Sequence, residues 1–317
     1  MSRVPRQRAP KIPDRRVLFI FLDGVGIGVK DARRNPFFAV RPPFLTELLG
    51  GALPSLRHRT IETREALCIP LDATLGVRGL PQSGTGQSTL YTGINTARMI
   101  GQHFGPYLYS TIKPVVAARS VFARLRSADP SHSLALANAF PQKFFYYLAG
   151  PRRRMVAGIH AALAADVRFR DIRDLRRGLA ISTDITAARW AQIGHPDAPV
   201  IRPYEAGRTL ARVAARHHFT LFEYFATDKA GHERSPAMAA AVLGDIDALL
   251  RGVHEQIDPT KTLVIVTSDH GNIEEIGIKT HTRYPVPLIL FGARGGFPVD
   301  GLHSLSHLVP AICRFLQ

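Results

Sequence analysis

The chain has 317 residues, of which 45% are hydrophobic, and a formal net charge of +16 at pH 7. A chain of this length can bury a large core without cross-links, and its two cysteines, Cys68 and Cys313, are too few for a disulfide framework or a cysteine-based zinc fold. The longest strand-like apolar run, 17–22, is far shorter than the roughly 20 residues that cross a bilayer. We therefore expect a soluble, cytoplasmic protein with no membrane association.

The chain opens with a basic stretch, residues 1–16, that is rich in arginine and proline and lacks the apolar segment of a signal peptide. We expect a flexible arm here. Buried strands are then predicted where short apolar runs occur, at 17–22, 134–140, 219–225, 262–268 and 286–291. Amphipathic helical patterns lie between them, for example at 205–216 and 237–256. This alternation predicts an α/β fold with a mostly parallel sheet sandwiched by helices.

One segment, 141–203, departs from this alternation because it has helical patterns and many arginines but no obvious central strand. We interpret it as a small helical lid inserted into a core formed by 17–140 and 204–317. Most of its Arg-rich part, 152–177, is typical of a solvated helix face. The same part is also the candidate specificity element above a site in the core.

The first strand is followed by DGVGIG at 23–28, which invites comparison with a dinucleotide-binding loop. The spacing excludes that interpretation, because Val29 stands where the third glycine of G-x-G-x-x-G would be. Asp23 is instead predicted to be a carboxylate at the edge of the sheet. The glycines beside it would let the backbone pass close to a bound group.

A glycine- and hydroxyl-rich turn at 80–93 leads into a predicted helix. The N-terminus of a helix offers free N–H groups to an anion and suits a nucleophilic oxygen. Four hydroxyl residues lie here, so composition leaves the choice of nucleophile open: Ser83, Thr85, Ser88 and Thr89. A plain Ser/Thr cap is the structural alternative.

The remaining candidates are carboxylates and imidazoles at strand ends. Asp228 and His232, four residues apart, follow the third predicted strand, Asp269 and His270 follow the fourth, and His281 precedes the fifth. Ligands of open α/β sheets bind beyond the carboxyl ends of the strands, so most of these side chains should converge on one edge. Such a donor set suits a borderline divalent cation, Zn²⁺ or Mn²⁺.

The ordered motifs DG, SGTG, DxxxH, DHG and HTRxxVPL resemble the alkaline phosphatase superfamily of two-metal enzymes, and within it cofactor-independent phosphoglycerate mutase and phosphopentomutase. The resemblance runs from Val17 to about Phe291. It implies that one cation is held by Asp228, His232 and His281, and a second by Asp23, Asp269, His270 and the nucleophile.

The family spacing also implies that the nucleophile is Ser83, which stands three residues before Gly86 and ten before Gly93, with Thr85 as the alternative. Gln87 replaces the histidine that the mutases carry after that glycine. The C/S-x-P-x-R frame of sulfatases is missing around Ser83, which disfavours a sulfatase.

The resemblance predicts a phosphate-monoester hydrolase that acts through a phosphoserine intermediate, uses two Mn²⁺ or Zn²⁺ ions and takes a small anionic phosphorylated substrate. The short lid favours water as the phosphoryl acceptor. The alternatives are a phosphomutase, a phosphodiesterase and a non-catalytic nucleic-acid-binding protein. The last is disfavoured because no nucleic-acid-binding motif accompanies the basic charge. Four residues are candidates for substrate contacts: Lys229, Arg283, Thr85 and Asn35. The two cations among them could equally be surface charges or pair with Glu233, Glu274 or Glu275.

Overall fold

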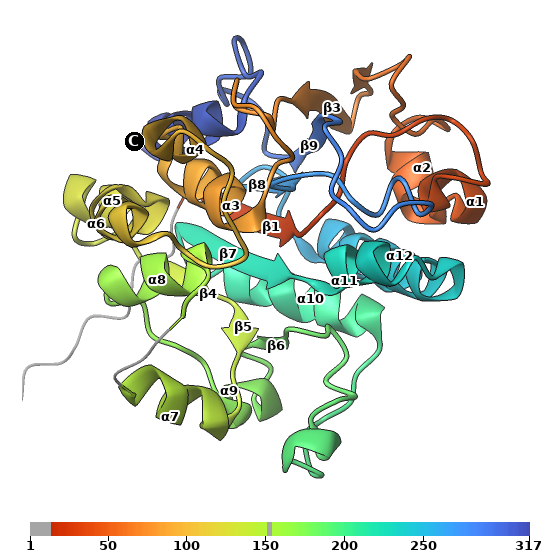
Figure 1. Ribbon diagram of the computed structural model, residues 1–317. Coiled ribbons are helices and arrows are strands. Elements are labelled where there is room, and N and C mark those ends of the chain that lie inside the picture. The colour runs from red at the N-terminus through yellow and green to blue at the C-terminus, as the bar shows by residue number, and fades with distance from the viewer. Residues whose placement is uncertain (1–13, 151–153) are drawn as a thin grey trace, which may run out of the picture.

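A computed structural model describes residues 14–150 and 154–317. Its centre is a seven-stranded sheet in the order β2-β3-β9-β8-β1-β7-β4 (Figure 1). The strands are β1 (Arg16–Leu22), β2 (Ile61–Glu62), β3 (Ala66–Leu71), β4 (Leu134–Leu136), β7 (Phe219–Tyr224), β8 (Thr262–Thr267) and β9 (Val286–Gly292). Four of them, β4, β7, β1 and β8, run parallel, and β9, β3 and β2 add antiparallel pairings at one side. The predicted α/β class with a mostly parallel sheet is confirmed.

Both faces of the sheet are buried, as the near-continuous apolar sequence of its central strands requires. In β1, Val17, Phe19 and Phe21 point into the core on one face, while Leu18 and Ile20 point into the core on the other. Side chains alternate in this way along any strand, so one apolar run can serve two helical layers.

Helices cover each face (Figure 1). The first layer packs on α3 (Ser83–Thr92) and contains α4 (Thr96–Ile100), α5 (Lys113–Arg119), α6 (Val121–Ala128), α8 (Ala157–Ala164) and α13 (Leu308–Phe315). The second layer contains α1 (Pro36–Val40), α2 (Pro43–Leu48), α10 (Pro203–Ala214), α11 (Ala226–Glu233) and the long α12 (Pro236–Gln256). No helix in the described part of the chain is long and apolar enough to span a membrane.

The predicted strand at 134–140 is broken in the structure. Its first part is β4, and its second part, β5 (Asn138–Ala139), pairs with β6 (Ile181–Ser182) in a separate two-stranded sheet. The break has a clear cause, because the Asn138 amide donates to the carbonyl of Glu223 and accepts from its N–H. The asparagine side chain thus takes the place of backbone pairing with β7.

The segment 141–203 does not form one separate body. Its helix α8 lies in the main core, where Ala157, Ile159 and Ala162 are buried against α3 and α5. The part from α9 (Ile172–Arg176) to Trp190 builds a small apolar cluster with Ala139, beside β5. The helix α7 (Gln142–Ala149) buries none of its residues fully, and it lies at the far side from α11 in Figure 1. Residues 1–13 of the expected basic arm lie outside the described residues.

Candidate metal centre

The predicted ligand residues converge at one edge of the sheet. Asp23 follows β1, Asp228 and His232 lie one turn apart on α11 directly after β7, and Asp269 and His270 follow β8. His281 precedes its strand rather than following it, but β9 runs antiparallel to β8. The beginning of β9 therefore lies at the same edge as the carboxyl ends of β1, β7 and β8.

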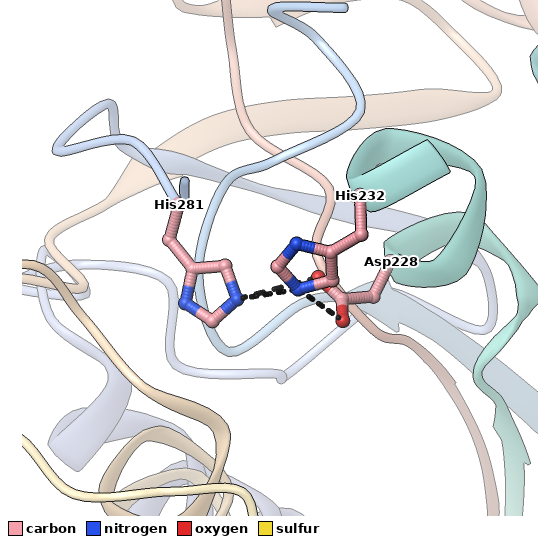
Figure 2. Close-up of side chains that lie close together, drawn as sticks. All are labelled: Asp228, His232 and His281. Atoms are coloured by element: carbon pink, nitrogen blue, oxygen red, sulfur yellow. Dashed lines mark hydrogen bonds and ion pairs between the residues drawn. The ribbon is translucent and has the colours of Figure 1, made fainter. Parts of the chain in front are cut away.

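One group consists of Asp228, His232 and His281 (Figure 2). The Nε2 atom of His232 lies 3.2 Å from Asp228 Oδ2, and Nε2 of His281 lies 3.5 Å from Asp228 Oδ1. The two Nε2 atoms are 3.2 Å apart. Three ligand atoms thus face a common point, as the binding of a single cation requires.

A second group consists of Asp23, Asp269 and His270, all buried. Nε2 of His270 lies 3.4 Å from Asp23 Oδ1 and 3.6 Å from Asp269 Oδ2, and 3.0 Å from the Ser83 hydroxyl. The His270 and His281 rings stack with their centroids 3.8 Å apart. The two groups are therefore neighbours, with Ser83 against the second.

All three imidazoles use their two nitrogens in the same way. The Nδ1 atoms of His281 and His232 lie 2.7 Å from the carbonyl oxygens of Pro81 and Lys279, and that of His270 lies 3.4 Å from the carbonyl of Gly271. A carbonyl can only accept, so each Nδ1 must carry the proton and each Nε2 presents its lone pair to the centre. This is the arrangement of metal-binding histidines, whose second nitrogen donates to a protein acceptor.

The carboxylates need a positive charge that the described residues do not supply. Asp23 Oδ1 and Asp269 Oδ2 are buried without a hydrogen-bond partner. Burial, and then the charges of Asp269 and Asp228, raise the pKa of Asp23 well above its usual range, and burial followed by the charge of Asp228 raises the pKa of Asp269 to about 8. Burial, reinforced by His281, lowers the pKa of His270. Unpaired buried carboxylates beside neutral imidazoles fit divalent cations.

A further carboxylate, Glu274, holds the surrounding loops in place. It is fully buried, and its Oε2 accepts from the backbone N–H groups of Gly26 and Asn272, each at 2.8 Å. Its Oε1 accepts from the hydroxyl of Thr282. Glu274 thus joins the loops that carry Asp23, His270 and His281. An acidic residue in a loop has no sequence signal that separates this role from an ordinary surface charge. The sequence therefore suggests Glu274 only as a partner for a surface cation.

The glycines after β1 have a different role from the one expected. A Cβ on Gly26 would lie 2.3 Å from Glu274 Oε1, and one on Gly24 would lie 2.6 Å from Asp228 Oδ1. The backbone therefore approaches side chains of the protein itself at these positions, one of which is the candidate ligand Asp228.

The candidate nucleophiles differ in their surroundings. Ser83 is the first residue of α3, and its hydroxyl faces His270. The hydroxyl of Thr85 is fully buried and is hydrogen-bonded to Phe104, whose N–H it accepts at 3.2 Å. Thr85 therefore fixes the loop at 101–106 and is not placed to contact substrate.

Two other expected substrate contacts are also placed elsewhere. Asn35 caps α1, accepting from Phe37 N–H at 3.1 Å and donating to the carbonyl of Val29 at 3.0 Å. Lys229 is exposed on α11 and lines none of the clefts beside the two groups. The expected alternative partner Glu275 binds Arg34 through two hydrogen bonds of 3.0 and 2.6 Å.

A cleft of about 360 Å³ opens over the first group, lined by Leu80, Gln82, Ser83, Pro106, Asp228, His232, Lys279, Thr280 and His281. A neighbouring cleft of about 340 Å³ shares three of these residues and contains Arg283. The described residues of 141–203 line neither cleft, and this includes the described part of the Arg-rich segment, 154–177. Its arginines make other contacts, as in the Arg168–Asp174 ion pair at 2.7 Å. Lys279, which the sequence did not single out, lines the first cleft.

A family model described as Metalloenzyme superfamily matches residues 204–316. Curated relatives include the 2,3-bisphosphoglycerate-independent phosphoglycerate mutases of Pyrococcus abyssi, 31% identical over 84 residues, and of Thermococcus kodakarensis, 30% identical over 90 residues. These matches cover 26% and 28% of this chain and 20% and 21% of the relatives, so the chain aligns with about a fifth of their length.

Solved structures resemble the whole chain. A Leishmania mexicana phosphoglycerate mutase aligns with a TM-score of 0.52 at 11% identity, covering 97% of this chain and 96% of its own. A cold-active alkaline phosphatase from Shewanella sp. aligns with a TM-score of 0.53 at 11% identity, covering 95% and 99%. Both likenesses concern the fold. Together with the family match they confirm the resemblance expected from the sequence: residues 204–316 match the model of the Metalloenzyme superfamily, and the fold is shared with an alkaline phosphatase and a phosphoglycerate mutase.

Proposed function

We propose that the protein is a phosphohydrolase that depends on two divalent cations and cleaves phosphate monoesters through a phosphoserine intermediate on Ser83. One observation carries the proposal: the hydroxyl of Ser83 lies 3.0 Å from His270 Nε2, beside two neighbouring groups of cation ligands. A serine that served only as a helix cap would not need an imidazole and two groups of cation ligands beside its hydroxyl.

The ligands of one cation would be Asp228, His232 and His281, and those of the other Asp23, Asp269, His270 and the Ser83 oxygen. When bound, two such ions lower the pKa of a hydroxyl nucleophile and neutralise charge on the phosphoryl group. The donor set suits Mn²⁺ or Zn²⁺.

The protein's own groups account for the remaining steps. Ser83, at the N-terminus of α3, loses its hydroxyl proton to solvent and presents its oxygen to phosphorus. The bond from phosphorus to the leaving oxygen breaks as the new one forms, and the leaving oxygen takes a proton from water. The positive end of the helix favours the anionic substrate. A water molecule then attacks the phosphoserine, releasing inorganic phosphate and restoring Ser83.

The accessibility of the cleft supports water as the acceptor. The His232 side chain is 45% exposed, and no described residue of 141–203 lines the cleft. A mutase must keep its phosphoenzyme from water until the substrate has reoriented. Phosphomutase activity is the second candidate, because the curated relatives of the C-terminal part are named as phosphoglycerate mutases.

The experiment compares hydrolysis of 4-nitrophenyl phosphate and bis(4-nitrophenyl) phosphate by the protein loaded with Mn²⁺ or Zn²⁺, wild type beside Ser83→Ala and Thr85→Ala. Monoester hydrolysis that is lost in Ser83→Ala and retained in a folded Thr85→Ala protein supports the proposal. Preference for the diester indicates a phosphodiesterase. If neither compound is hydrolysed but 2- and 3-phosphoglycerate are interconverted, the protein is a phosphomutase.

A further inference from the structure

We infer that the site selects phosphate monoesters that carry a second anionic group, and that Arg283 binds this group. The inference rests on the proposed function and adds a substrate class to it. Its basis is the continuity of two clefts. The cleft over the first ligand group and the cleft that contains Arg283 share Leu80, Thr280 and His281. A ligand with its phosphate at the cation ligands can therefore extend past His281 into the second cleft.

Arg283 is anchored but not neutralised. Its Nη1 donates to the carbonyl of Gly79, in the loop that leads to Ser83, and the residue lines the second cleft. A carbonyl carries no net charge and uses one of five N–H donors, so a planar fork remains for a carboxylate or phosphate. No carboxylate among the described residues pairs with Arg283.

The acid of the second cleft does not compete for Arg283. Glu275 lines that cleft, but its carboxylate is held by Arg34, with the charged atoms 2.6 Å apart. The pair is neutral as a whole. Lys279 lines the first cleft, on the other side of His281, and adds a second positive charge that has no ion-pair partner in the described part of the chain. The walls around His281 thus carry two cationic side chains without an ion-pair partner among the described residues. The Asp228 carboxylate in the same wall faces the cation ligands instead, so an anionic ligand group is left to compensate Arg283 and Lys279.

The test uses two small monoesters that differ in one charge, phosphoglycolate and 2-hydroxyethyl phosphate. Release of inorganic phosphate by the metal-loaded wild type gives the ratio of kcat/KM values for the pair. We expect the wild type to prefer phosphoglycolate, and Arg283→Met to reduce the ratio about tenfold or more, because a hydrogen bond to a charged group is lost. Arg283→Lys should restore part of the ratio. Arg173→Met is the matched control, since Arg173 is exposed, pairs with Asp171 and lines neither cleft.

A wild type that does not discriminate, or an Arg283→Met ratio equal to that of the wild type, overturns the inference. Propane-1,3-diyl bisphosphate is assayed beside phosphoglycolate. Whichever of the two has the higher kcat/KM relative to 2-hydroxyethyl phosphate identifies the second anionic group that the subsite takes, a phosphate or a carboxylate. Thermal shifts of the metal-loaded proteins with the same compounds separate the two proposals. If no monoester is hydrolysed but phosphoglycolate raises the Tm of wild type more than that of Arg283→Met, the subsite stands and the proposed hydrolysis falls.

Discussion

The three carboxylates Asp23, Asp228 and Asp269 lie close together at the edge of the sheet, and two of them are fully or almost fully buried. Without a cation, their mutual repulsion and burial favour the protonated forms, which is why the pKa values of Asp23 and Asp269 rise. The arrangement therefore costs stability in the metal-free protein and gains it in the loaded protein. This opposition distinguishes a cation site from a structural cluster.

Replacing Asp269 by asparagine should stabilise the metal-free protein and destabilise the metal-loaded protein. At pH 8.5, where the buried carboxyls of the chelated protein would have to ionise, the variant should unfold at a higher temperature than the wild type, with a gain of about 1–3 kcal/mol. In excess Mn²⁺ or Zn²⁺ the wild type should be the more stable. Differential scanning calorimetry with and without chelator checks both signs, and a variant less stable under both conditions would contradict the assignment of Asp269 as a ligand.

Glu223, on β7, is a further buried acid, and its Oε1 accepts from the hydroxyl of Tyr91 on α3 at 2.8 Å. Burial raises its pKa from 4.5 to about 7. An acid whose pKa is raised in the folded state contributes most below pH 4.5, and this contribution is lost between pH 4.5 and 7, because the unfolded chain ionises first. No motif in the sequence marks this glutamate, which stands inside an otherwise apolar strand pattern.

Glu223→Gln keeps the hydrogen-bond acceptor for Tyr91 but cannot ionise. The free energy of unfolding of the wild type should therefore fall relative to that of the variant between pH 5 and 8, by about 2–3 kcal/mol. Urea titrations at fixed metal concentration across this range measure the difference. Parallel pH profiles for the two proteins would show that the folded state does not raise the pKa of Glu223 above its value in the unfolded chain.

The helix α3 positions Ser83 through close packing against the loop after β8. Gly86 lies inside α3, and a Cβ at this position would lie 2.8 Å from the carbonyl oxygen of Asp269. All ten residues of α3 are buried, which leaves the helix no room to move away. The close contact with the Asp269 backbone, and not the formation of a turn, therefore requires a glycine at position 86.

Two glycine-to-alanine changes separate packing from helix propensity. Gly86→Ala should destabilise the protein by about 1–3 kcal/mol and reduce kcat at least tenfold, since α3 or the Asp269 loop must shift. Gly244→Ala, inside α12 with open space at its Cβ, should stabilise the protein by about 0.5–1 kcal/mol and leave kcat unchanged. Chemical denaturation and monoester assays on both variants check this. Equal effects of the two changes would mean that α3 is not held against Asp269.

The strands that could be predicted from sequence are those whose neighbours are also apolar and regular. The prediction at 17–22, 219–225 and 262–268 matches β1, β7 and β8 closely, because each is buried on both faces. β3 was missed because Pro70 interrupts its pattern, and in the structure Pro70 is paired in register with Pro287 of β9. The break after β4 depends on a side chain from another strand, which no local pattern reveals.

Across the molecule, the sequence predicted which ligand residues lie together, but not which backbone groups orient them. Asp23, Asp228, His270 and their partners could be placed at one edge because strand ends in such sheets share that edge. The carbonyls that orient His232 and His281 come from Lys279 and Pro81, positions without any distinctive side-chain chemistry. Local pattern also could not place α8, which lies within the segment predicted as a lid, because its apolar residues suit the main core as well as a separate lid, and the structure buries them in the main core.

Removal of the cations should therefore loosen one region and leave the rest folded. The carboxylate and imidazole ligands come from four segments of the chain, and Glu274 joins three of them by hydrogen bonds. Chelation should lower the free energy of unfolding by about 2.7 kcal/mol for each site that was filled at a hundred times its Kd. Hydrogen exchange should accelerate at 23–28 and 268–284, which contain the ligand loops, while α5, α6 and α8 stay protected, since they pack in the core of the opposite layer from α11. Exchange that changes equally in both regions, or in neither, would argue that the carboxylates and imidazoles hold no ion.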